Sequence, residues 1–397
     1  MTRLALEEVS TDWKLDTVYE VRRLQSFLAK LSKIRPELAD TWHFSDYLKI
    51  NPKINLDQSP VCTPEQALEP NLRHAAGNRP TTACPPKGDS EDQKKMTVLE
   101  ILSQYSIDPD DGRDQDLFIR DAQGRPQYAF SDQKWFGAMQ GPDSQAFRHL
   151  EKTPFDWKHW ESTLGLPLQS LGEATQRAEI YFQLSQLAFA LEEPYWGWRF
   201  LGGSLHYLED LHNPYHAAQI SYSLAKKVMQ AYVTWGWKSH GFIPTCSHVV
   251  SNSHRFFESY VFRPGGNDHG QKAEALALLK KKDTLAMNGS VKNLAEEVRN
   301  SSNVHFATLT QAVVSITHPT LFGPYRFQSD KGLEEDPLLF IQKVPDFEKS
   351  NQIIFGIVKD RFESAGWVIR TVVKKVEENR LGNNPDELLK TLDRLLN

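Results

Sequence analysis

Apolar residues recur at three- and four-residue spacing along much of the chain, most strongly from about residue 171 onward. This is the period of an amphipathic α-helix, in which positions i, i+3, i+4 and i+7 share one face. Few segments alternate with the two-residue period of a half-buried strand. We therefore expect a mainly α fold, a single compact multi-helix domain over residues 1–397, with helices at 16–31, 95–105, 173–191, 196–211, 216–235, 251–261, 273–282, 291–298, 306–315, 350–378 and 385–396.

A polar, proline-rich stretch interrupts this pattern between residues 51 and 94. It contains prolines at positions 52, 60, 64, 70, 80, 85 and 86. Proline removes a backbone N–H and cannot sit in a helix interior, so we expect a long irregular loop near the N-terminus. Cys62 and Cys84 flank part of this stretch, and they could either form a disulfide or remain two free thiols.

Composition narrows the kind of chemistry that the chain can carry. The net charge of −5 argues against a general basic surface for duplex nucleic acid. There are only 3 cysteines and no CxxC pair, so a metal would be held by His, Asp and Glu. The chain contains no run of about 18 apolar residues, so we expect no transmembrane span. The segment from Met1 to Trp13 lacks the basic start and apolar core of a signal peptide.

The stretch 203–218 contains the first candidate metal ligands. His206 and Asp210 are four residues apart, which places both on one face of a helix. Pro214 then ends that helix, and the turn could bring His216 back to the same point. Imidazole and carboxylate are natural zinc ligands. Taken alone, the stretch is equally well explained by a surface His–Asp pair beside an unrelated histidine.

A second pair with the same spacing changes that balance. His254 and Glu258 are again four residues apart, and Phe256 and Phe257 between them indicate a partly buried helix. One His–acid pair is common by chance. Two such pairs in a helical protein, one of them followed by a third histidine just past a proline, are more typical of a dinuclear metal site.

These residues resemble a known signature. The string H-Y-L-x-D at 206–210, followed by P-x-H-A at 214–217, resembles the signature of the zinc-dependent bacterial phospholipases C, a superfamily and fold shared with the fungal single-strand nucleases. The resemblance covers roughly residues 145–260, and it implies a phospholipase C or nuclease type of helical fold. It also implies two groups of zinc ligands: Asp110, His149, His206 and Asp210 for one ion, and His216, His254 and Glu258 for the other.

Some of these assignments leave alternatives open. His159 competes with His149 as the upstream histidine, and Asp108 competes with Asp110 as the upstream acid. Family members with a third zinc ion hold it through an N-terminal tryptophan and a histidine shortly after it. Trp13 has no such following histidine, so the resemblance implies two zinc ions, or three if His43 serves instead.

The resemblance implies a phosphodiester hydrolase, most simply a phospholipase C that cleaves phosphatidylcholine or a similar glycerophospholipid. Asp110 would also be the catalytic group that accepts the proton of the attacking water. Tyr207, Tyr215 and Phe147 could line a pocket for a choline-like head group by cation–π contact, or could stack bases.

The expected partners follow from this activity. They are a phospholipid or other phosphodiester substrate and a transiently contacted membrane surface, with no stable nucleic-acid partner, and the family suggests a secreted or periplasmic protein. Two rival interpretations remain: a single-strand nuclease of the same fold, and a catalytically degenerate zinc-binding helical protein. A nuclease would need a basic, aromatic groove, whereas the basic run 280–282 is typical of a solvated helix face.

Overall fold

The computed structural model describes residues 1–50, 56–57, 95–107, 109, 118–120, 126–128, 148–153, 171–219, 242–262, 269–281, 283, 287, 289–317, 341, 344–380 and 382–397. Helices dominate these residues, and the strands are only two or three residues long, which confirms the prediction of a mainly α fold. The assignment of the whole chain to one domain, and to the phospholipase C or nuclease type, stays a prediction.

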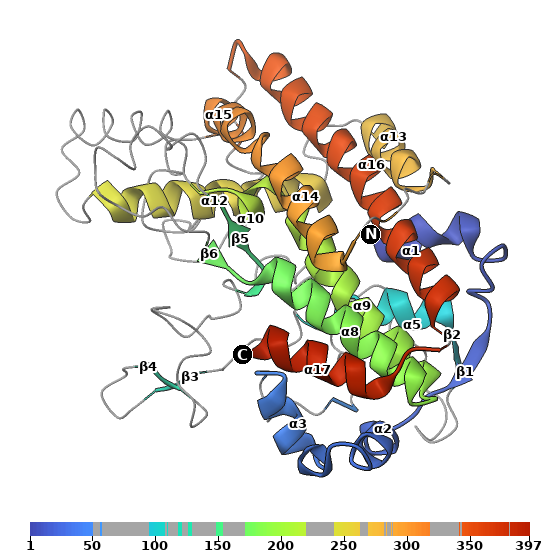
Figure 1. Ribbon diagram of the computed structural model, residues 1–397. Helices are drawn as coiled ribbons and strands as arrows, with labels where there is room; N and C mark the ends of the chain where they lie inside the picture. Colours follow the sequence, from blue (N-terminus) through green and yellow to red (C-terminus); the bar gives the residue numbers. More distant parts are fainter. Residues whose placement is uncertain are drawn as a thin grey trace, which may run out of the picture.

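Figure 1 shows the α-helices of the described part in the order of the sequence. They are α1 (Thr2–Leu6), α2 (Leu24–Leu31), α3 (Thr41–Tyr47), α5 (Val98–Tyr105), α8 (Ala174–Ala190), α9 (Pro194–Leu211), α10 (Pro214–Ala217), α12 (Phe242–Phe262), α13 (His269–Leu279), α14 (Val291–Asn303), α15 (Phe306–Ile316), α16 (Phe347–Asn379) and α17 (Pro385–Leu396). Two short 3-10 helices, η1 (Glu7–Val9) and η2 (Pro36–Leu38), complete the helical elements.

The strands form three small antiparallel pairs. β1 (Val18–Glu20) pairs with β2 (Lys95–Thr97), β3 (Phe118–Arg120) with β4 (Pro126–Tyr128), and β5 (Glu151–Lys152) with β6 (Leu171–Gly172). The first pair corrects the predicted helix over 16–31, because its first part is a strand and the helix begins only at Leu24. The predicted helix over 95–105 likewise begins at Val98, after Thr97 and Glu100 have formed a capping box.

The predicted helix over 216–235 is wrong at its start. α10 ends at Ala217, and Ala218 has an extended backbone that forms a parallel bridge with Thr153. Residues 220–241 lie outside the described part, as does the predicted loop 51–94 apart from Leu56 and Asp57. The helices predicted at 173–191, 196–211, 251–261, 273–282, 291–298, 306–315, 350–378 and 385–396 are present as α8, α9 and α12 to α17.

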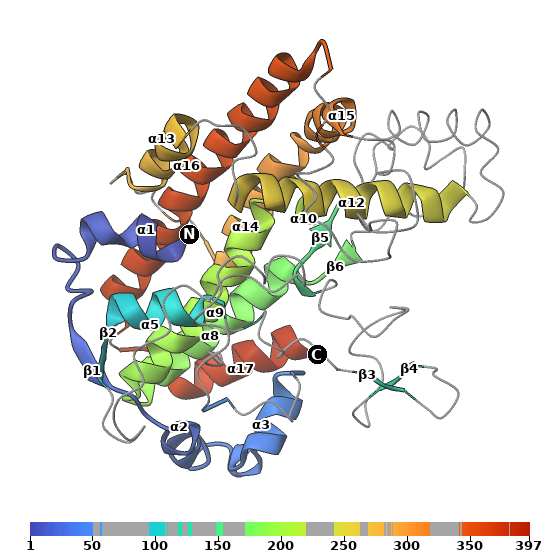
Figure 2. The ribbon, with the colours of Figure 1, turned by 180° about the vertical axis from the view of Figure 1, so that it is seen from behind.

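The pair α8 and α9 forms the centre of the molecule (Figures 1 and 2). A short turn joins the two helices, and α5, α14 and α17 pack around them. Close approach is possible because Gly203 has no side chain: a Cβ atom there would lie 2.6 Å from Cδ1 of Tyr181 on α8. α9 is buried along nearly its whole length, so its side chains have fixed surroundings.

Two hydrophobic clusters meet where α9 passes into α10. The larger cluster contains α8 and most of α9, down to Leu211. The smaller one begins at Tyr215 and includes Phe257 of α12, Phe306 of α15 and Ile354 of α16. Polar residues between Leu211 and Tyr215 therefore lie at the boundary of two cores. Within the described ranges, no helix combines the length and the apolar character that a membrane span requires.

Candidate metal centre

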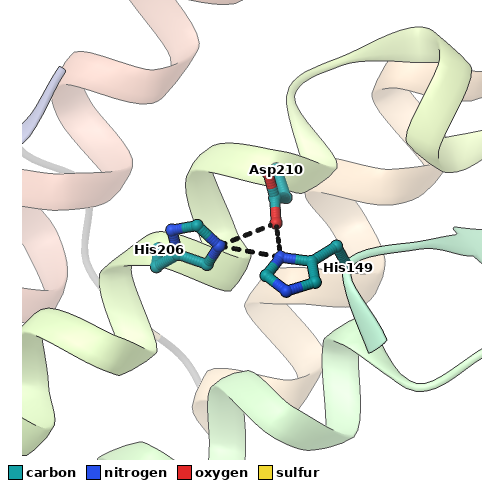
Figure 3. Close-up of side chains that lie close together, drawn as sticks. All are labelled: His149, His206 and Asp210. Atoms are coloured by element: carbon teal, nitrogen blue, oxygen red, sulfur yellow. Dashed lines mark hydrogen bonds and ion pairs between the residues drawn. The ribbon is translucent and has the colours of Figure 1, made fainter. Parts of the chain in front are cut away.

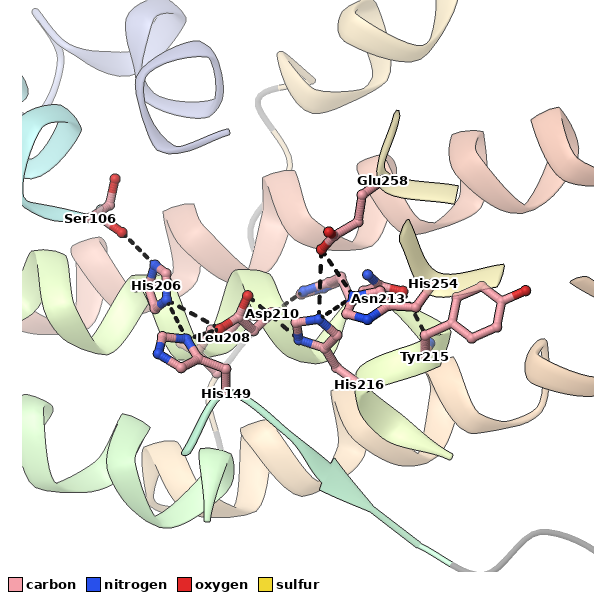
Figure 4. A network of polar contacts seen from close by, with 11 residues as sticks. Ser106, His149, His206, Leu208, Asp210, Asn213, Tyr215, His216, His254 and Glu258 are labelled. Carbon is pink, nitrogen blue, oxygen red and sulfur yellow. Dashed lines mark hydrogen bonds and ion pairs between the residues drawn. The ribbon is translucent and has the colours of Figure 1, made fainter. Parts of the chain in front are cut away.

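The turn between α9 and α10 positions three of the predicted ligands. His206 and Asp210 share one face of α9, one helical turn apart. α9 ends at Leu211, and the Asn213 side chain then caps α10 by accepting a hydrogen bond from the Tyr215 backbone N–H at 3.0 Å. Pro214 occupies the first position of α10, where its missing N–H costs nothing. The chain therefore turns back, and His216 lies beside Asp210 (Figure 4).

The first ligand group consists of His149, His206 and Asp210 (Figure 3). Nδ1 of His149 is 2.7 Å from Oδ2 of Asp210 and 2.8 Å from Nε2 of His206. Nε2 of His206 is in turn 3.1 Å from the same Oδ2 atom. The three side chains are at most 8% exposed. Three potential ligand atoms therefore converge on one buried point.

An outer hydrogen bond fixes the orientation of His206. Its Nδ1 lies 2.7 Å from the carbonyl oxygen of Ser106, which can only accept, so Nδ1 carries the proton and donates. In the neutral imidazole, Nε2 is then the nitrogen without a proton, and it faces the point shared with His149 and Asp210. This is the arrangement by which ligand histidines are held in metal sites.

The second ligand group consists of His216, His254 and Glu258. Nε2 of His216 and Nε2 of His254 are 2.8 Å apart. Oε1 of Glu258 lies 3.0 Å from the His254 nitrogen and 3.7 Å from the His216 nitrogen. His254 and Glu258 are both on α12, one turn apart, and their side chains are 26% and 33% exposed. This group is therefore open to solvent on its α12 side, unlike the first.

Asp210 belongs to the first group and also approaches the second. Its Oδ2 atom faces His149 and His206, while its Oδ1 atom is 3.6 Å from Nδ1 of His216 (Figure 4). The second group instead uses Nε2 of His216, so Asp210 is a candidate ligand in the first group and an outer neighbour of His216 in the second. The two groups are adjacent, with the first buried and the second half-buried at His254 and Glu258.

The electrostatics keep these groups in their metal-binding forms. Burial by itself would raise the pKa of Asp210, but His206, His216 and His149 together lower it well below the ordinary value. Burial lowers the pKa of His216, and Asp210 only partly opposes this effect. The lowered pKa values favour the ionised carboxylate of Asp210 and the neutral imidazole of His216, and these are the forms that bind a metal ion.

Six of the seven predicted ligands come together in these two groups: His149, His206, Asp210, His216, His254 and Glu258. The seventh, Asp110, lies outside the described residues, as do its alternative Asp108 and the competing His159. His43 belongs to neither group; its side chain is 62% exposed and bonds to Asp40. Both groups could hold a metal ion.

The predicted role of two tyrosines is wrong. Tyr207 and Tyr215 are completely buried, so neither can line a pocket for a head group or a base. Phe147, the third residue of that prediction, lies outside the described part. The sequence did not predict that the Ser106 carbonyl orients His206, because the position of a backbone oxygen does not depend on a recognisable residue type.

Searches against protein-family models, curated proteins and solved structures find no match to this chain. The class that can be assigned from fold and site is therefore a mainly helical protein with two adjacent His/carboxylate groups that could hold metal ions.

Proposed function

We propose that this protein is a zinc-dependent phosphodiester hydrolase with two zinc ions in adjacent sites. The observation that carries the proposal is the closeness of two ligand groups, since Asp210 of the first group approaches His216 of the second, with 3.6 Å between Oδ1 and Nδ1. Two ions a few ångströms apart are typical of enzymes that hydrolyse phosphate esters. Six candidate ligand residues from four segments of the chain converge there. A surface ion pair would bring together only two residues.

The donor set favours zinc over other divalent ions. Four imidazoles and two carboxylates suit a borderline cation, whereas calcium and magnesium prefer oxygen alone. Tetrahedral zinc with bonds near 2.05 Å needs ligand atoms about 3.3 Å apart. The spacings of 2.7, 2.8 and 3.1 Å in the first group, and of 2.8, 3.0 and 3.7 Å in the second, approach this value. Only small side-chain movements are needed.

Zinc ions bound here would stabilise negative charge on phosphoryl oxygens and lower the pKa of a water molecule. The chain's own residues prepare for this chemistry. Ser106 holds His206 in the required tautomer, and the ionised Asp210 supplies negative charge in the first group and beside the outer nitrogen of His216. Substrate would approach at His254 and Glu258, since these are the most exposed members of the two groups.

Glycerophospholipids are the substrate class that is best supported, so the expected activity is that of a phospholipase C. The signature at 206–217 resembles that of the zinc-dependent phospholipases C, and Glu258, rather than an aspartate, is the last ligand, as in that branch. The net charge of −5 gives no general attraction to a polyanion such as single-stranded DNA. The expected reaction separates glycerol from phosphate in phosphatidylcholine or a related glycerophospholipid.

Initial rates on micellar short-chain phosphatidylcholine and on single-stranded DNA, with zinc at pH 7, test this proposal. We expect lipid hydrolysis that a chelator abolishes and that Asp210→Asn lowers by more than about 100-fold, beyond the loss typical of an outer hydrogen-bond partner. Asp40→Asn is the matched control, because Asp40 is exposed and caps α3, a role that asparagine fills equally well.

Each other result has a definite meaning. DNA cleavage without lipid hydrolysis would replace the phospholipase by a single-strand nuclease. Inactivity on both substrates with zinc bound would favour a degenerate metal-binding protein. An Asp210→Asn variant with an unchanged rate would remove Asp210 and the first ligand group from the active site.

A further inference from the structure

Two buried tyrosines flank the ligand histidines of the α9–α10 region. Tyr207 directly follows His206, and Tyr215 directly precedes His216. Both side chains are completely buried, although neither belongs to a ligand group. Each is part of a hydrophobic cluster, which explains its burial but not its place beside a ligand histidine.

Each tyrosine contacts a ligand histidine that comes from a distant segment of the chain. The ring of Tyr207 lies 5.4 Å from the ring of His149 with an angle of 37° between the planes. The ring of Tyr215 is stacked on His254, with centroids 5.9 Å apart and an angle of 29° (Figure 4). Tyr207 also meets His206 edge-on at 5.3 Å, so the ligand histidines that it contacts both belong to the first group.

Both tyrosines are themselves held firmly from behind. Tyr207 packs against Tyr181 at 5.7 Å, and the guanidinium of Arg177 lies 6.0 Å from its centroid. Tyr215 packs against Phe257 at 5.9 Å and Phe306 at 5.4 Å. A ring with fixed neighbours is a rigid surface against which an imidazole can be oriented.

His149 and His254 need such a surface more than the other two ligand histidines do. His206 and His216 are carried by α9 and α10, which are buried. His149 instead lies just before the two-residue strand β5, and His254 is on α12, which packs mainly against α15. A metal ligand must be held within about 10–20° of its binding orientation, so the planes of these two rings have to be fixed by contact.

We propose that Tyr207 and Tyr215 are positioning residues for metal binding, each orienting the histidine that a distant segment contributes to one ligand group. Tyr207 serves the first group through His149, and Tyr215 serves the second group through His254. The inference rests on the proposed metal site, but it does not depend on which reaction that site performs.

The test measures the affinity of each site for zinc, by competition with a chromophoric chelator, and the visible spectrum of the cobalt(II)-substituted protein. The background variant Glu258→Gln weakens the second group and so identifies the ion bound by the first. We expect Tyr207→Leu to weaken the first ion by about 10-fold and Tyr215→Leu to weaken the second by a similar factor, as losses of outer contacts to metal ligands do. Each should alter the cobalt spectrum of its own site alone.

Three further variants separate positioning from general stability. Tyr207→Phe and Tyr215→Phe keep the ring and should restore both the affinity and the spectrum. Tyr195→Leu removes another buried tyrosine of α9, whose ring packs on Tyr105 and Trp196, and should leave both ions unchanged. Tyr207→Met or Tyr215→Met fills the space with a flexible side chain and takes the place of a leucine variant that does not fold.

Several results would overturn the inference. These are equal weakening of both ions by either leucine variant, phenylalanine variants as impaired as the leucine ones, or an effect of Tyr195→Leu of the same size. Unchanged affinities in a protein that binds two ions would also overturn it while leaving the proposed hydrolase intact. Conversely, the expected pattern in a protein without hydrolase activity would refute the proposed function and keep the inference.

Discussion

The substitution Gly203→Ala should destabilise the protein although alanine is the better helix former. Gly203 lies where α9 crosses α8, and an added Cβ atom would be 2.6 Å from Cδ1 and 2.9 Å from Cε1 of Tyr181. The Tyr181 ring cannot retreat easily, because it is buried between the guanidinium of Arg177, at 5.3 Å, and the ring of Tyr207, at 5.7 Å.

The magnitude follows from two opposing effects. Alanine gains about 1 kcal/mol over glycine in a helix interior. Overpacking a well-filled core costs about 1–3 kcal/mol, and a contact this short with a trapped ring belongs at the upper end. We therefore expect a net loss of about 2 kcal/mol in the free energy of unfolding.

Gly356→Ala is the matched control. Gly356 lies on α16 at an exposed position, and an added Cβ atom would meet nothing within 4 Å. It should gain about 1 kcal/mol, which separates the two variants by about 3 kcal/mol. The assay is urea unfolding in the presence of a chelator, so that metal binding does not contribute. A Gly203→Ala protein as stable as Gly356→Ala would refute the close packing of α8 on α9.

Three other expectations concern the site. Chelation should lower the stability of the metal-loaded protein by about 2.7 kcal/mol for each ion supplied at 100 times its Kd, as measured by urea unfolding; an unchanged midpoint would contradict metal binding. His206→Ala should abolish hydrolysis of phosphatidylcholine in a rate assay, whereas His43→Ala, at an exposed position, should not; equal rates would remove His206 from the site. Burial and the nearby Arg361 lower the pKa of His212 to about 3, below the unfolded value of about 6.5, so its contribution to stability is complete above pH 6.5 and is lost as the pH falls toward 3. A His212→Gln variant should therefore lose stability less steeply over this range, by up to about 1.4 kcal/mol per pH unit in chelator, and parallel curves would contradict a neutral His212.

Helices with strong local signals could be predicted from the sequence. α17 begins at Pro385 after the cap residue Asn384 and ends at Leu396, which are the predicted bounds, because the start signal and the apolar period agree. The secondary structure of the segment 16–31 was harder to predict. Its apolar spacing suits a helix, but Val18–Glu20 instead pairs with Lys95–Thr97, and no local pattern indicates a partner so far away along the chain.

The ligands of the candidate site could likewise be predicted from a local pattern, because the two residues of each His–acid pair are one helical turn apart. What brings the pairs together is not local. Asn303, at the end of α14, donates from Nδ2 to the carbonyl oxygen of Ala217 at 3.1 Å and to Oγ1 of Thr153 at 2.8 Å. This amide joins the end of α10 to the segment that follows His149, and the backbone N–H of Thr153 donates to the same Ala217 oxygen at 3.1 Å.

Asn303 thus helps to set the distance between the two ligand groups without belonging to either. Nothing in its spacing marks it, because it is an asparagine at a helix terminus, where asparagine is common for other reasons. The same holds for Tyr207 and Tyr215, which resemble pocket residues in sequence and are core residues in the fold. The spacing of residues along a helix can therefore predict which side chains carry the chemistry, whereas the contacts that orient them depend on packing between segments distant in the sequence.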